Sequence, residues 1–154
     1  MKIISIVTVL LLTMTCLGFA NTKNDNKASV SYKQGICNEI SNYVDALLYG
    51  NTHGHGSTTS CSYTDERLLI KSTSALTQEQ MKHFVLFAFT AAGALNNNDF
   101  ILPEKIYVGY GDDCQVLTTE DASRLQDMAS FGVRSGFSNA MILASHAPKV
   151  PCPK

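Results

Sequence analysis

Residues 76–95 read LTQEQMKHFVLFAFTAAGAL, and this stretch decides the fold class. Thr77 and Gln80 form a capping box, in which each side chain accepts a hydrogen bond from the other residue's backbone amide. Leu76 and Met81 stand at the two positions of a hydrophobic staple. After this start, apolar residues recur on nearly every side of the predicted helix. A helix of this kind is expected to be buried between layers of structure.

The sequence that follows this helix changes to the two-residue period of a strand. Ile106, Val108 and Tyr110 alternate onto one face, which predicts a strand over residues 104–110. Gly111-Asp112-Asp113 then predicts a turn, and the sequence from Cys114 to Thr118 predicts the return strand of a hairpin.

On the other side of the central helix, helical spacing predicts a helix over 32–49 that ends at Gly50. Strands are predicted near 60–64 and 66–73.

A last helix is predicted to begin at Thr118 or Thr119. Gly132 and Gly136 lie four residues apart in it, which either allows a close backbone approach or breaks the helix in two. Residues 147–154 contain three prolines and are predicted to form an extended tail held by Cys152.

These elements predict an α+β fold, with a small, mainly antiparallel sheet covered by about three helices and held by two disulfides. We expect one globular domain over 32–154, preceded by a flexible N-terminal segment over 21–31. The chain has 154 residues, 45 % of them hydrophobic, which is enough for one core.

The first twenty residues have the pattern of a secretory signal peptide. A positive charge at Lys2 is followed by a short apolar run, with the small residues Gly18 and Ala20 before the expected cleavage point. Cleavage after Ala20 predicts a secreted or periplasmic protein. Lipid attachment at Cys16 is the weaker alternative, because Thr13 and Thr15 occupy positions that usually hold Leu and a small residue.

Four cysteines remain after this cleavage: Cys37, Cys61, Cys114 and Cys152. An even number in an exported chain predicts two disulfides, for which three pairings are possible. We favour the local pairing, Cys37–Cys61 with Cys114–Cys152, because the proline-rich tail has no other anchor. No two cysteines are close enough in sequence to form a typical zinc hook.

The predicted hairpin is a candidate contact surface for a protein partner. Tyr107 and Tyr110 offer rigid aromatic area beside the turn residues Gly111, Asp112 and Asp113. The alternative is that the glycines and aspartates only form the turn.

His53 and His55, separated by one glycine, are a candidate metal site. Two imidazoles at this spacing can reach one Cu²⁺ or Zn²⁺ ion, with a third ligand supplied from elsewhere in the chain. The alternative is an ordinary exposed loop.

Catalytic motifs are otherwise scarce. Cys37 with a histidine base would make a small cysteine hydrolase, but a disulfide at Cys37 is the competing interpretation. No cofactor fingerprint or phosphate-binding loop is present. The net charge of −1 gives no attraction to nucleic acid, and no run outside the N-terminus is long enough to span a membrane.

The sequence therefore predicts a binding protein rather than an enzyme, acting on a protein partner and requiring no cofactor. The concrete form of this hypothesis is an inhibitor or immunity-type protein of the bacterial periplasm. The absence of any Asn-x-Ser/Thr glycosylation sequence favours a bacterial origin. A metal-binding protein and a cysteine hydrolase remain the alternatives.

Overall fold

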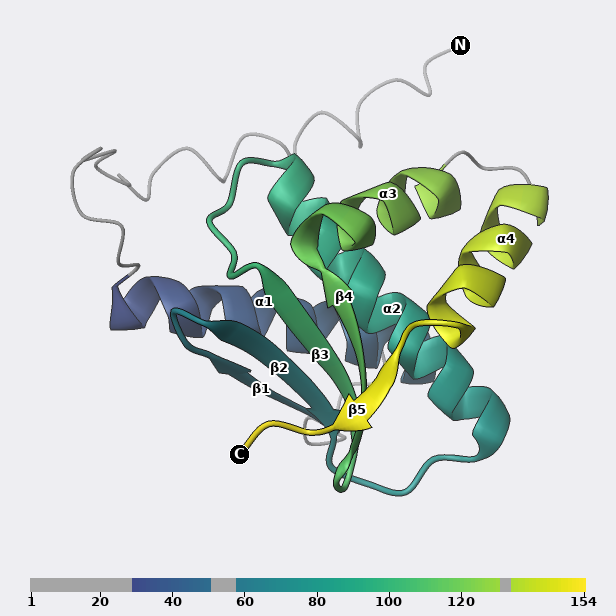
Figure 1. Ribbon diagram of the computed structural model, residues 1–154, viewed down its shortest axis with the longest axis horizontal. Helices are drawn as coiled ribbons and strands as arrows, with labels where there is room; N and C mark the ends of the chain where they lie inside the picture. Colours follow the sequence, from purple (N-terminus) through teal and green to yellow (C-terminus); the bar gives the residue numbers. More distant parts are fainter. Residues whose placement is uncertain (1–28, 51–57, 131–133) are drawn as a thin grey trace, which may run out of the picture.

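The structure, a computed structural model, describes residues 29–50, 58–130 and 134–154 (Figure 1). The elements in chain order are α1 (Val30–Tyr49), β1 (Thr59–Tyr63), β2 (Arg67–Ser72), α2 (Gln78–Asn97), β3 (Lys105–Tyr110), β4 (Asp113–Thr118), α3 (Thr119–Ser130), α4 (Arg134–Ser145) and β5 (Lys149–Pro151). The predicted signal peptide, the histidine pair His53 and His55, and Gly132 lie outside the described residues. Helix α1 begins at Val30, so residues 30 and 31 are helical and do not belong to the flexible segment predicted over 21–31.

The strands form one five-stranded sheet in the order β1-β2-β3-β4-β5. Three of the four pairings are antiparallel, and the parallel pairing joins β2 to β3. Parallel neighbours need a crossover, which α2 provides. The α+β class with a mainly antiparallel sheet is therefore confirmed, and the helices number four in the described residues rather than about three.

Figure 1 shows the sheet lying in front of α1 and α2, which cover one of its faces. The alternation of side chains along β2 and β3 explains this layering. Leu68, Ile70, Ile106 and Val108 all have fully buried side chains. The residues between them, such as Leu69 and Tyr107, are only half-buried because they point to the opposite face of the sheet.

Helix α2 is the centre of the packing, as its apolar sequence predicts. Its capping box is present: the Thr77 amide donates to Gln80 Oε1 at 3.0 Å, and the Gln80 amide donates to Thr77 Oγ1 at 3.2 Å. α2 packs against α1, α3, α4 and β3. At Gly93 the backbone of α3 comes so close that a Cβ atom would lie 2.1 Å from the carbonyl oxygen of Ala122.

The predicted last helix is divided into α3 and α4, with residues 131–133 outside the described part of the chain. The predicted close approach also occurs, because a Cβ atom at Gly136 would lie 2.5 Å from the carbonyl oxygen of Met128. The two helices therefore pack directly against each other.

The C-terminal tail is extended and held by Cys152 as predicted, but its place in the sheet was not predicted. Its residues Lys149–Pro151 form β5, which pairs with β4 and adds a fifth strand to the sheet. Beyond this strand, the chain turns back so that the Arg67 guanidinium on β2 donates a hydrogen bond to the carbonyl oxygen of Lys154.

Both predicted disulfides are confirmed. Cys37 of α1 is bonded to Cys61 of β1, with 5.3 Å between their Cα atoms. Cys114 of β4 is bonded to Cys152 after β5, with a Cα separation of 4.9 Å. The first bond ties a helix to one edge of the sheet, and the second holds the C-terminal strand at the other edge.

Candidate functional site

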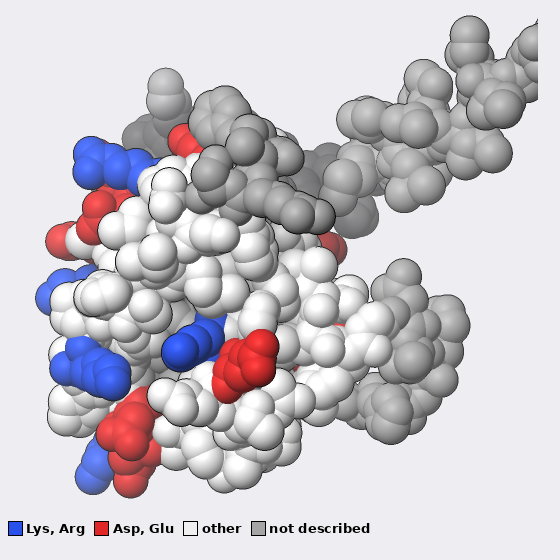
Figure 2. Space-filling model, turned by 90° about the vertical axis from the view of Figure 1, so that its right-hand side faces the viewer, with Lys and Arg blue, Asp and Glu red and all other residues white. Residues whose placement is uncertain are grey.

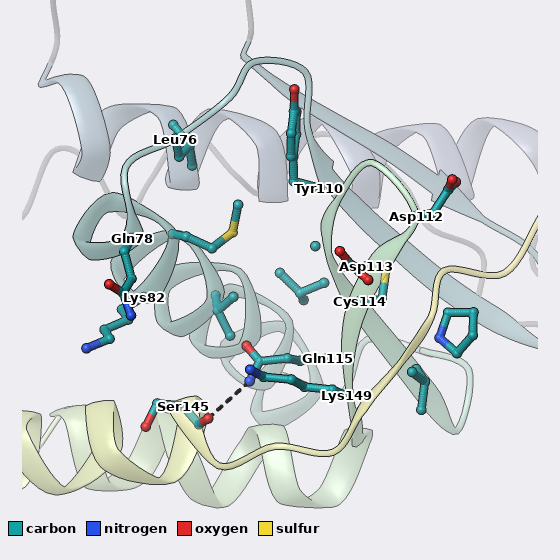
Figure 3. A pocket seen from close by; sticks show the side chains of 16 residues that line it. Leu76, Gln78, Lys82, Tyr110, Asp112, Asp113, Cys114, Gln115, Ser145 and Lys149 are labelled. Carbon is teal, nitrogen blue, oxygen red and sulfur yellow. Dashed lines mark hydrogen bonds between the residues drawn. The ribbon is translucent and has the colours of Figure 1, made fainter.

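A groove of about 960 Å³ lies at the end of the sheet where β3 and β4 meet. One wall is the first part of α2. The other wall is formed by the β3–β4 hairpin and β5, and the end of α4 closes one side (Figure 3). Its volume lies within the range usual for ligand-binding sites, about 300 to 1,000 Å³. We take this groove as the candidate site.

The α2 wall is mostly apolar, although Gln78 and Lys82 also line it. Leu76, Met81 and Val85 line it, and the first two are the staple residues of the sequence pattern. Because the capping box fixes where α2 begins, it also fixes where these side chains face the sheet. Val85 is almost fully buried, whereas Leu76 and Met81 remain half-buried and accessible from the groove.

The hairpin forms the outer end of the opposite wall. Tyr110 pairs with Asp113, which leaves Gly111 and Asp112 as a two-residue turn. Gly111 has a φ of +58° while Asp112 does not have a positive φ, the pattern of a turn that requires glycine at its first central position. Gly109 is also required, because a Cβ atom there would lie 2.0 Å from the carbonyl oxygen of Asp113.

Gln115 holds the end of α4 against this wall. Its side-chain amide lies 3.2 Å from the carbonyl oxygen of Ser145 and 3.3 Å from those of Ala144 and Ala147, to which it can donate. These carbonyls lie at and just after the end of α4, where a helix leaves carbonyl groups without intrahelical partners. The Ala144 carbonyl also accepts a hydrogen bond from the Ala147 amide at 3.2 Å. The contact fixes α4 relative to β4, and Figure 3 shows the Gln115–Ser145 bond beside the cavity.

The groove contains charges of both signs. Figure 3 shows Asp113 and Lys149 pointing into the space between the hairpin and α2, whereas Asp112 points away from it. Both Asp113 and Lys149 are exposed. The ion pairs in the described residues are Lys33–Asp65 and the pairs that Arg124 forms with Glu120 and Asp121. Asp113 and Lys149 therefore have no ion-pair partner among the described residues.

The residues predicted to contact a partner lie on both faces of the sheet rather than on one. Tyr110, Asp112 and Asp113 line the groove together. Tyr107 lies on the other face, where it pairs with Leu69 and Val116.

The sequence analysis missed further groove residues: Met81, Val85, Gln115 and Lys149. Met81 could have been identified from its position in the hydrophobic staple. Gln115 could have been identified from its position in the return strand of the hairpin. Lys149 had no signal, because its strand was not predicted.

The face of the molecule that carries α4 has few charged side chains, apart from those of the groove such as Lys82 and Lys149 (Figure 2). Figure 2 views the molecule from the side of α4, and most of the charged side chains gather toward the left of this view, where the sheet lies. On α4 itself, the apolar side chains of Phe137, Ile142 and Leu143 are exposed by 40 to 55 %.

The alternative sites gain no support from the described residues. The Sγ atom of Cys37 is bonded to Cys61, so it offers no thiolate nucleophile. The two histidines that the structure describes are apart: His83 Nδ1 contacts the Glu79 carbonyl oxygen on α2, and His146 Nδ1 contacts that of Ile142 on α4. Within the described ranges, no three His, Cys, Asp or Glu side chains are grouped to hold a metal ion.

A second polar cluster joins α1, β1 and the segment before β3. Tyr63 Oη donates to the Ile101 carbonyl oxygen at 2.7 Å, and the Ile101 amide donates to Tyr32 Oη at 2.7 Å. Burial, with smaller contributions from Tyr32 and Asp65, raises the pKa of Tyr63 from 10.0 to about 12. The cluster lies away from the groove and has a structural role, because it fastens the chain between α2 and β3.

Comparison with family models, curated proteins and solved structures finds no match to this chain. No helix in the described ranges has the length and apolar character needed to cross a membrane.

Proposed function

We propose that this chain is an exported, disulfide-stapled binding domain that holds a segment of a protein partner in the groove between α2 and the β3–β4–β5 edge. The single observation that carries the proposal is the groove itself. It joins an apolar wall, an exposed tyrosine and charges of both signs in one accessible cavity of about 960 Å³. Apolar and aromatic anchors with a few polar groups are typical of protein recognition sites.

The walls of the groove are held in place before any partner arrives. The Cys114–Cys152 bond joins β4 to the chain after β5, and Gln115 fixes the end of α4. A rigid site loses less conformational entropy on binding, which favours affinity. This rigidity supports a binding role, and the concrete form of the proposal is an inhibitor or immunity-type protein.

The proposed location is the bacterial periplasm or the extracellular space. Two disulfides persist in oxidising compartments, and residues 1–20 have the pattern of a signal peptide with cleavage after Ala20. The mass of the intact protein purified from its native source identifies the first residue. A chain that begins at Asn21 supports export by this route, and a lipid-modified chain that begins at Cys16 contradicts it.

Photocrosslinking at two matched tyrosines tests the binding site. Tyr110 lies in the groove and is 41 % exposed, whereas Tyr43 lies on α1 and is 42 % exposed. We expect p-benzoylphenylalanine in place of Tyr110 to give an adduct of defined mass in envelope extract. The same crosslinker in place of Tyr43 gives none. Equal adducts at both positions, or an adduct only at Tyr43, would contradict the proposal.

A groove variant completes this experiment. Met81→Lys places a charge in the apolar wall at a half-buried position, where it can be tolerated by the fold. When this change is combined with the crosslinker at Tyr110, the adduct should decrease about tenfold or more. Circular dichroism identical to that of the parent protein is the control for folding.

A further inference from the structure

Two opposite charges stand on neighbouring strands of the groove wall without contacting each other. Asp113 pairs in register with Pro151, and Gln115 pairs with Lys149. Asp113 and Lys149 are therefore diagonal neighbours on the same face of the sheet, about 7 to 8 Å apart. Neither forms an ion pair in the described part of the chain.

This spacing is close to the advance of two residues of an extended chain, about 6.6 Å, because each residue of a strand advances by about 3.3 Å. A bound extended segment that crosses obliquely from β4 to β5 would place residues i and i+2 over the two charges. Residue i+1 would point the opposite way, since successive side chains of an extended chain alternate. In the groove, that opposite direction is the α2 wall, where the apolar side chains of Leu76, Met81 and Val85 lie beside Gln78 and Lys82.

We propose that the groove selects a segment in which a basic, an apolar and an acidic residue follow one another. The basic side chain binds the carboxylate of Asp113, the acidic side chain binds the ammonium group of Lys149, and the apolar side chain packs against Met81. This inference rests on the proposed function, because it names the chemistry of the segment that the same groove holds.

The fold itself does not use the side-chain charges of Asp113 and Lys149. Asp113 begins β4 and Lys149 begins β5, and their side chains contribute no hydrogen bond that the described residues require. Their neighbour Gln115, by contrast, is engaged by α4. Both charges are therefore available to a ligand, and because both are exposed, an ion pair at each one would contribute about a two- to fivefold gain in affinity.

Four synthetic heptapeptides test this inference against the mature domain labelled with ¹⁵N. Each has the form Gly-Ser-X-Leu-Z-Ser-Gly with blocked ends, where X and Z are Arg and Glu, Arg and Arg, Glu and Glu, or Gln and Gln. Amide chemical shifts followed to millimolar peptide give the affinities. We expect the Arg-Leu-Glu peptide to bind at least threefold more tightly than the other three, with shifts at β4 and β5.

Charge reversal provides the decisive comparison. In the Asp113→Lys variant the preferred peptide should become Glu-Leu-Glu, and in the Lys149→Glu variant it should become Arg-Leu-Arg. The matched control is Lys105→Glu, an exposed position at the other end of the sheet that should leave the preference unchanged.

The outcomes separate this inference from the proposed function. Equal binding of all four peptides, no shift with any of them, or a preference that charge reversal leaves unchanged would overturn the inference. The crosslink at Tyr110 would still stand in each of these cases and would keep the groove as the binding site. Loss of that crosslink overturns the proposed function instead.

Discussion

The contact between α2 and α3 at Gly93 predicts that one added methyl group destabilises the fold. In Gly93→Ala the new Cβ atom would lie 2.1 Å from the Ala122 carbonyl oxygen and 2.9 Å from the Ser123 amide nitrogen. Contacts of Cβ atoms essentially never fall below 3.0 Å, so α3 must move by about 0.9 Å. Backbone atoms cannot rotate away as a side chain can, and overpacking of this kind costs about 1 to 3 kcal/mol.

The same substitution also brings a gain, because alanine is the better helix former by about 1 kcal/mol. Since the methyl group meets rigid backbone, we place the strain at the upper end of its range and expect a net loss of about 2 kcal/mol. Gly35→Ala is the matched control. Gly35 is an exposed glycine within α1 with no atom within 4 Å of its Cβ position, so this change should stabilise by about 0.5 to 1 kcal/mol.

Urea unfolding with the disulfides intact, followed by far-ultraviolet circular dichroism, measures both variants. With an m value of about 1.5 kcal/mol per molar urea, the midpoint should fall by about 1.3 M for Gly93→Ala. It should rise by about 0.3 to 0.7 M for Gly35→Ala. A Gly93→Ala protein as stable as the parent would refute the close packing of α2 on α3, whatever the control shows.

Two further predictions concern stability. Replacing Cys37 and Cys61 together by alanine opens a loop of sequence separation 24, which should cost about 3.5 kcal/mol in the same urea assay, and a loss below about 1 kcal/mol would contradict the pairing. Tyr63→Phe should cost about 1 kcal/mol at pH 7, because the hydrogen bond to the Ile101 carbonyl oxygen is lost. The raised pKa of Tyr63 means that the unfolded chain ionises first, so the parent protein loses stability between pH 10 and about 12, whereas the variant lacks this contribution. The difference between the two proteins should therefore shrink over that interval, and a constant difference would contradict the burial of this phenol.

Local signals explain which parts of the fold were predictable. The start of α2 is encoded within five residues, from Thr77 to Met81, and the structure has the capping box there. The β3–β4 hairpin is similarly local, because the glycines it requires, Gly109 and Gly111, lie at the end of β3 and in its turn. The disulfide pairing was predicted from proximity in sequence and from the lack of another anchor for the tail.

The parts that escaped prediction depend on contacts between distant segments. β5 has three residues and ends in Pro151, so it has no strand period of its own and forms only because β4 and Cys114 hold it. The groove joins Met81 to Lys149, which no sequence pattern connects. The separation of Tyr107 from Tyr110 was predictable, because residues three apart in a strand point to opposite faces.

The two disulfides close loops that neither overlap nor enclose one another, since residue 61 precedes residue 114. A chain delivered amino-terminus first into an oxidising space presents Cys37 and Cys61 before Cys114 emerges. An oxidant that joins cysteines in their order of arrival therefore produces the native pairs directly, with no need for an isomerase. The second bond must wait for Cys152, which follows β5, so the sheet edge beside the groove is secured after the contact between α1 and β1.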